Sequence, residues 1–328
     1  MTPLIEDTAK PGRAGTDSHD GSAPPSATTK RSSRLVNGYK WWIPWVFLLP
    51  TIVAVLAFLI VPLTAGLFIA FTEWNVVSGI GGIRWVGFGN FQELFQDDMF
   101  WSSAVRTLFY AGVGTPLAVT CGMFLGLALN RPMPARGVIR AIFFLPSLVN
   151  VIAAGTVWLT LLNPRSGMVN QFLRAVGLDN PPGWFTSQQW ALPAIVLMSV
   201  WVSAGYVAIL IIAALQDLPT ELYESAKLDG AGTIRQFTTI TFPGLVPVLT
   251  FLLITSFIGR SQGFGLIQFM TSGGPGDATT VLSYYMYEVG FHWYRFGYAA
   301  SIGVMSMLAV LALSIALFKL QRGRGLYT

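Results

Sequence analysis

One arginine lies inside a long apolar segment of the chain. Ser256, Arg260 and Gly263 recur at spacings of four and three, which puts them on one face of a helix among mostly apolar neighbours. A charge inside a membrane costs about 3 kcal/mol or more, so such a residue normally faces a polar cavity or a partner. In a cavity, a guanidinium would grip carboxylate or phosphate groups with two parallel hydrogen bonds. The alternative is that Arg260 reaches out to the membrane interface, and the residues alone leave both possibilities open.

A second cluster of polar residues lies in the loop from Gln216 to Phe242, which contains ESAKLD followed by GAGT. Pro219 suits a first helical turn, and the two glycines interrupt the helix, so the loop is predicted to form two short helices with a bend at Asp229-Gly230. A plain amphipathic anchor on the membrane surface would favour Lys and Arg over Glu and rarely needs a glycine bend. The apolar sides that can dock consist of Leu218, Leu222 and Ala226 on the first helix and Ile234 and Phe237 on the second.

Residues typical of enzymes do not gather anywhere in the sequence. His19 and His292 are far apart, Cys121 is the single cysteine, and there is no glycine-rich GxxxxGK phosphate loop. The acidic residues lie in loops, with none in mid-membrane where a proton relay would need it. We therefore expect no catalytic residues, no metal and no cofactor in this chain, and no hydrolysis of a nucleotide by the chain alone.

The elements that carry these residues are predicted from composition. Because 53% of residues are hydrophobic and only 11% are charged, we expect an integral membrane protein. A helix needs about 20 apolar residues to cross a bilayer, and the segments lack the alternating pattern of a barrel, so the predicted fold is an all-α bundle of six transmembrane helices. The six stretches are Ile43 to Phe71, Ala104 to Leu129, Val138 to Leu162, Leu192 to Leu215, Leu245 to Met270 and Tyr298 to Leu320.

The orientation follows from the basic residues. The amino-terminal tail, the loop from Arg131 to Arg140, the loop from Gln216 to Phe242 and the end after Leu317 hold fourteen of the twenty Lys and Arg residues. These regions, and hence both termini, are predicted to be cytoplasmic. The net charge of +5 then reflects loops that face anionic lipid, and it indicates no nucleic-acid partner.

Residues 1–38 are rich in Pro, Ser, Thr, Gly and Ala, so we expect a disordered cytoplasmic tail. It lacks the short apolar core of a signal peptide. The transmembrane domain is expected to span residues 39–328, with residues 216–242 as its long cytoplasmic loop.

Several stretches resemble the permease subunits of binding-protein-dependent ABC importers, in their carbohydrate branch. The loop sequence LYESAKLDGAGTIRQFTTITFPGLVP is similar to the cytoplasmic coupling loop of that family. Further likeness lies in FLLPTIVAVLAFLIVPL, GFGNFQELF, FFLPSLVNVIAAGTVW, GLIQFMTSGGPGDATTVLSYYMYEVGF and FGYAAS. The resemblance implies a permease of the type I importer fold, in which the loop seats in a cleft of a separate ATPase. It assigns this coupling role to Glu224, Ser225, Ala226, Asp229, Gly230 and Ala231, with Ser225 a small departure from alanine.

The resemblance also implies a cargo path. In maltose-type importers the sugar is held from the face that carries Ser256, and Arg260 and Gly263 stand where those importers have amides. The stretch WVSAGYVAIL implies an aromatic contact at Tyr206 and smaller contacts at Val202 and Ser203. These departures disfavour maltose, and the guanidinium favours an acidic sugar or a glycerophosphodiester over a neutral sugar.

The partners implied are a second, related permease, two copies of an ATP-binding subunit that would hold ATP and magnesium, an extracytoplasmic solute-binding protein, and membrane lipid. The protein would lie in the plasma membrane of a bacterium or an archaeon. The binding protein is expected to dock on the outer loops, which offer broad contact area through their tryptophans, Trp74, Trp85, Trp101, Trp184 and Trp190. The rival hypotheses are a membrane enzyme or channel whose loop binds a regulator, and an ABC exporter.

Overall fold

The computed structural model describes residues 42–322. The chain divides into two compact units, Met1–Val55 and Leu56–Thr328. In the first unit the described part is essentially one helix, α1 (Ile43–Val55). The predicted tail, residues 1–38, lies outside the described residues.

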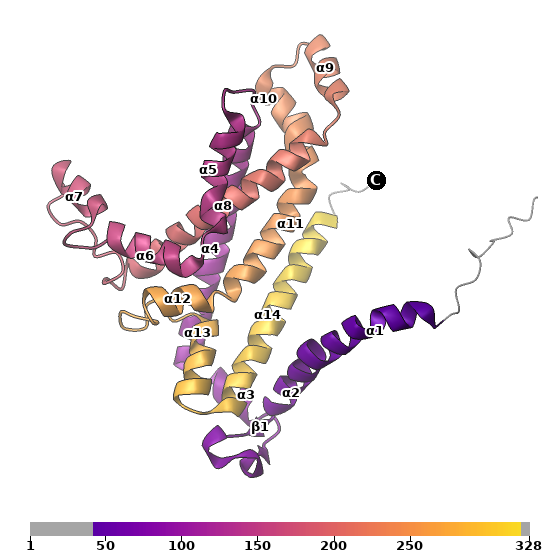
Figure 1. Cartoon of the computed structure of the whole chain (residues 1–328). Helices are drawn as coiled ribbons and strands as arrows, with labels where there is room; N and C mark the ends of the chain where they lie inside the picture. Colours follow the sequence, from indigo (N-terminus) through magenta and orange to yellow (C-terminus); the bar gives the residue numbers. More distant parts are fainter. Residues whose placement is uncertain (1–41, 323–328) are drawn as a thin grey trace, which may run out of the picture. The chain divides into compact units, whose positions relative to one another are not determined.

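The second unit is almost entirely helical (Figure 1). Its one sheet among the described residues pairs β1 (Thr72–Glu73) with β2 (Arg84–Trp85), antiparallel, with Thr72 opposite Trp85. The helices are α2 (Val61–Ile69), α3 (Gly89–Phe95), α4 (Asp98–Leu129), α5 (Arg136–Leu148), α6 (Val151–Leu161), α7 (Met168–Ala175), α8 (Ala191–Gln216), α9 (Thr220–Leu228), α10 (Thr233–Gln236), α11 (Phe242–Ser261), α12 (Phe264–Met270), α13 (Leu282–Tyr287) and α14 (Phe296–Arg322).

Five helical segments of the described chain are long and apolar enough to cross a membrane, and a bent pair of helices makes up to six. This confirms the predicted all-α membrane fold. The five are Ile43–Ile69, Asp98–Leu129, Ala191–Gln216, Thr233–Ser261 and Phe296–Lys319.

The third predicted span, Val138 to Leu162, is not one straight helix. The chain forms α5 and α6 there, and these are bent by 98° at a short break. Pro146 lacks the backbone N–H of a regular turn, and Val149 has extended backbone angles. The Asn150 side chain then caps α6, since its Oδ1 accepts a hydrogen bond of 2.8 Å from the N–H of Ile152. An asparagine cap inside an apolar run therefore starts a new helix.

The fifth span also differs from its predicted range, Leu245 to Met270. It begins earlier, at Thr233, and it ends at Ser261, after which α12 restarts at Phe264. At the break, a Cβ atom on Gly263 would lie 2.9 Å from the ring of Tyr110. The chain turns where its backbone passes close to α4, which no periodicity in the local sequence shows.

The core of the second unit forms where α4 and α8 pack along each other, with α11 beside them. One buried cluster contains Ile195, Met198 and Ile267, and another contains Val207, Ile211 and Leu245. On α8, Gly205 lies against the backbone of α5, and a Cβ atom there would clash with the carbonyl oxygen of Phe143. This contact fixes how closely α5 can approach α8.

A network of polar side chains connects helices at the end of the bundle that carries α3. We call this end the α3 end. The hydroxyls of Tyr285 and Tyr298 donate to Asp97 Oδ2 at 2.5 and 2.6 Å. Burial raises the pKa of the Asp97 carboxyl, but these bonds and backbone N–H donors lower it by more, so its pKa lies below the usual range. Beside it, Arg295 forms an ion pair of 2.6 Å with Glu93. The network joins α4, α13 and α14 without any disulfide.

Candidate functional site

The six residues predicted for the cargo path line one cavity of about 610 Å³ in the second unit. Helix α8 contributes Val202, Ser203 and Tyr206, and α11 with the break after it contributes Ser256, Arg260 and Gly263. Tyr206 is among the lining residues and is 49% exposed. The residues that sequence reasoning missed are Tyr110, Val151, Ser199, Phe251, Thr255, Gly259, Gly265 and Leu266.

Arg260 is the one charged side chain among the residues that line this cavity. Its residue is only 8% exposed. Nη2 donates hydrogen bonds to Ser203 Oγ at 2.8 Å and to the Ser199 carbonyl oxygen at 3.2 Å. Nε is buried and has no partner in the described structure. The arginine thus crosses from α11 to α8 with part of its hydrogen-bonding capacity unused.

Two residues of α4 shape the space around this arginine. At Gly114 a Cβ atom would lie 2.9 Å from Arg260 Nε, so any larger residue would push the side chain. Tyr110 is buried and lines the same cavity. Ser199 could have been found, because Ser199, Ser203 and Tyr206 follow a helical spacing of four and three. Tyr110 and Gly114 are far away in the sequence and gave no such signal.

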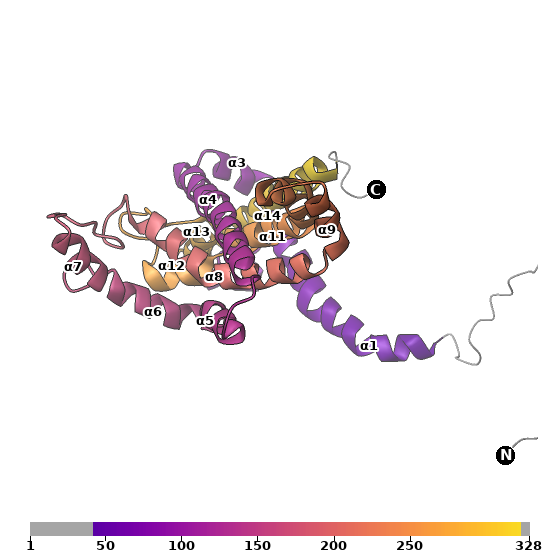
Figure 2. The same ribbon diagram turned by 90° about the horizontal axis from the view of Figure 1, so that it is seen from above.

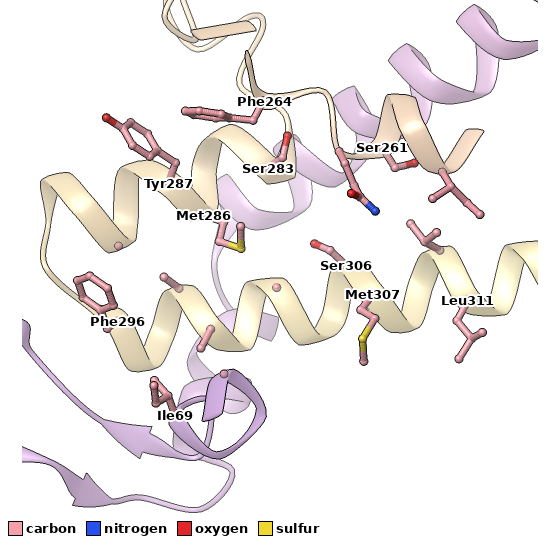
Figure 3. A pocket seen from close by; sticks show the side chains of 18 of the residues that line it. Ile69, Ser261, Phe264, Ser283, Met286, Tyr287, Phe296, Ser306, Met307 and Leu311 are labelled. Carbon is pink, nitrogen blue, oxygen red and sulfur yellow. The ribbon is translucent and has the colours of Figure 1, made fainter. Parts of the chain in front are cut away.

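A larger cavity of about 870 Å³ lies between α2, the α11–α12 junction, α13 and α14 (Figure 3). Met286 of α13 and Ser306 of α14 point into the gap between their helices. Its lining contains Phe264, Tyr287 and Phe296 but none of the predicted residues and no charged side chain. It lacks the cation that distinguishes the smaller cavity.

The predicted coupling residues form a helix end of defined geometry. The N–H of Gly230 donates to the Lys227 carbonyl at 3.0 Å, and that of Ala231 donates to the Ala226 carbonyl at 2.8 Å. With Gly230 at φ +74°, this is a Schellman motif, which ends α9 and turns the chain into α10. Ala226 and Ala231 occupy the two positions that frequently make an apolar contact in such a motif.

The two helices present an exposed surface at the end of the bundle opposite to α3, called here the α9 end. Glu224, Ser225 and Asp229 are exposed, and Leu228 and Ile234 on either side of the bend are 90% and 82% exposed. The residues of the predicted docking side of the first helix differ in exposure. Leu218 is half-buried against Gly244, whereas Leu222 is exposed. Sequence reasoning missed Leu228. It also missed the Tyr223 hydroxyl, which lies 2.9 Å from Thr241 Oγ1 and holds α9 to the base of α11.

A family model described as "Binding-protein-dependent transport system inner membrane component" matches residues 114–324. The chain belongs to this family. It is the permease subunit of a binding-protein-dependent ABC importer in the carbohydrate-uptake branch, a multi-pass inner membrane protein whose ATPase is a separate chain. The matched residues include the coupling segment and most of the cargo-path cavity.

Relatives cover nearly all of the permease. The lactose transport system permease protein LacF of Rhizobium radiobacter is 33% identical over 91% of this chain and 99% of its own length. The trehalose/maltose transport system permease protein MalF of Thermococcus litoralis is 32% identical over 85% and 94%. A solved bacterial ABC transporter involved in the import of the acidic polysaccharide alginate superposes with a TM-score of 0.74 at 29% identity, covering 86% of this chain and 95% of that one. The enzyme, channel and exporter hypotheses are thereby set aside.

Proposed function

We propose that this permease conducts a sugar that carries negative charge, and that Arg260 holds the charged group in the cavity between α8 and α11. The observation that carries the proposal is a buried guanidinium among lining residues that include no acidic side chain. A buried cation without a counterion is costly, and an anionic cargo would supply the missing charge. Tyr206 would stack on a sugar ring, and Ser256 and Ser203 would bond its hydroxyls.

The likeness to the alginate transporter supports an acidic cargo, since alginate is an acidic polysaccharide. A neutral sugar is the second candidate, favoured by the hydrogen bonds from Arg260 to Ser203 and Ser199, which would suit a purely structural arginine. LacF and MalF are named for the transport of lactose and of trehalose and maltose, which are neutral sugars, and this supports the second candidate. The glycerophosphodiester remains an anionic alternative to an acidic sugar.

Arg260→Gln is expected to lower uptake of an acidic oligosaccharide by about 10- to 100-fold, the equivalent of a charge-assisted hydrogen bond of about 1.5–3 kcal/mol. Arg260→Lys keeps the charge and should retain more uptake. Labelled-sugar uptake is measured in cells beside the yield of the assembled transporter. Unchanged uptake of the native acidic cargo by the Gln variant would refute a contact with it, and loss of the complex itself would assign Arg260 to assembly.

The coupling role is proposed for the bend between α9 and α10. Leu228 and Ile234 are exposed apolar side chains on a rigid turn, and Glu224 beside them can accept a hydrogen bond from an arginine of an ATPase cleft. Ser225, Ala226, Asp229 and Ala231 keep the surface small enough for close approach. ATP and magnesium would then sit on the partner, whose closure would move α11 through the continuous helix Thr233–Ser261.

The assembly proposed around the permease has a second, related permease that closes the cargo cavity and two ATPase copies at the α9 end. That end would face the cytoplasm of a bacterium or archaeon, together with both chain termini. The binding protein would dock at the α3 end. Among the tryptophans predicted for that contact, Trp85, Trp101 and Trp190 are exposed, and Trp74 and Trp184 are half-buried.

A further inference from the structure

Helix α7 carries an exposed apolar stripe that the transport function does not use. Met168, Phe172 and Val176 follow at spacings of four along α7 and the residue that caps it. They are 70%, 66% and 63% exposed. At about 100° per residue the three side chains span about 80° of the helix, so they form one continuous face.

The opposite side of α7 is anchored to its own loop, which holds the stripe outward. Asn170 is fully buried, and its side-chain Nδ2 donates to the carbonyl oxygens of Pro182 at 3.1 Å and Pro164 at 3.3 Å. Its Oδ1 accepts from the indole N–H of Trp184 at 2.7 Å. Because Asn170 lies about 160° around the helix from Phe172, the loop cannot fold over the stripe without breaking these bonds.

The surroundings of α7 match a lipid interface. The helix follows α6 and projects beyond it, away from α11 and α14 in both views (Figures 1 and 2). Helix α6 is the second half of the apolar bent pair α5–α6, and its Ile152 and Val157 are exposed like the stripe. The exposed apolar side chains of α6 are therefore followed along the chain by those of α7.

The charges beside the stripe complement a phospholipid surface. Arg165 and Arg174 are exposed basic residues at the two ends of this short segment, and Arg174 is held by bonds to the carbonyl oxygens of Pro164 and Arg165. Basic residues on the polar side of an apolar helix face are typical of segments that lie in the membrane interface. A docking surface for a water-soluble partner would not need to be continuous with a membrane span.

We propose that α7 lies in the headgroup region of the bilayer, with Met168, Phe172 and Val176 inserted among the acyl chains and Arg165 and Arg174 beside lipid phosphates. The partner is the lipid bilayer itself. Seated in this way, α7 would fix the height of α6 and so of the helix break at Asn150, whose neighbour Val151 lines the cargo cavity.

The test uses the assembled transporter in nanodiscs of phosphatidylethanolamine and phosphatidylglycerol. In a Cys121→Ser background, Phe172→Cys and Gln171→Cys are each labelled with the polarity-sensitive dye NBD. Gln171 is the matched control, since it is exposed but turned about 100° from Phe172. The dye at residue 172 is expected to emit at shorter wavelength than the dye at 171, and to lose most of its fluorescence when lipids carrying a shallow doxyl quencher are included.

Equal quenching of both positions by aqueous iodide, with no effect of doxyl lipid, would overturn the proposal. A shift at residue 172 that arises only when the binding protein is added would equally overturn it and make α7 a protein-docking surface. Complex yield is recorded for both variants, and Met168→Cys serves as a second probe of the stripe if Phe172→Cys does not assemble. None of these readouts depends on which sugar is transported.

Discussion

Cells that carry Gly230→Trp are expected to lose at least about 10-fold of their uptake while the permease stays in the membrane. Gly230 has φ +74°, where an L-residue costs about 1–2 kcal/mol, and this is a factor of about 5–30 in the population of the native turn. The indole would also add bulk to the exposed bend that carries Leu228 and Ile234, the side chains of the proposed ATPase contact. Uptake of labelled cargo and the amount of membrane-inserted permease are the measurements.

A matched pair of alanine variants separates the turn from the bulk of the indole. A Cβ atom meets nothing within 4 Å at either Gly230 or Gly232, but only Gly230 has a positive φ. Gly230→Ala should therefore reduce uptake and co-purification of the ATPase, and Gly232→Ala should change both little. Normal uptake by Gly230→Trp at normal expression would contradict the coupling role of the bend.

Gly205→Val is expected to remove most of the folded permease from the membrane. The position lies against the Phe143 carbonyl, so an added side chain would force α5 away from α8. Overpacking costs about 1–3 kcal/mol when side chains can shift, and here the obstacle is backbone. Gly259→Val is the control, because a Cβ atom there meets nothing within 4 Å. Detergent-resistant folded protein, measured by size-exclusion chromatography, should fall for Gly205→Val alone, and equal yields of the two variants would show that the α5–α8 contact is not tight.

The spans and the coupling bend could be predicted because they depend on local sequence. Length and hydrophobicity decide which segments are apolar enough to cross, and the glycine at residue 230 marks a helix end by itself. The two spans that differ in shape or range from the prediction have a common cause. Both spans are interrupted within apolar runs. Asn150 starts the new helix α6 through its side-chain cap, and Gly263 passes close to Tyr110 just before α12 starts, and hydropathy averages over both features.

The cargo cavity could be predicted on α8 and α11 but not on α4. Ser203, Tyr206 and Ser256 stand at positions that contact the sugar in the resembling family. Their convergence on one cavity could therefore be predicted from helical spacing and from the resemblance. Tyr110 and Gly114 belong to the same site only because α4 packs against α8 and α11. The hydrogen-bond partners of Arg260 could not be predicted either. Ser199 and Ser203 lie 61 and 57 residues away in the chain, and only tertiary packing brings them to the guanidinium.

The charge of the cargo is the central claim, and transport by the unmodified protein tests it most directly. The transporter is reconstituted into liposomes with its binding protein and ATP, and uptake of a uronic-acid oligosaccharide is compared with uptake of its neutral methyl ester. The two differ in charge and little else. We expect the acid to be imported at least about 10-fold faster than the ester, as the loss of one charge-assisted hydrogen bond would give. Equal uptake of the two, or preference for the ester, would show that Arg260 does not select a negative charge.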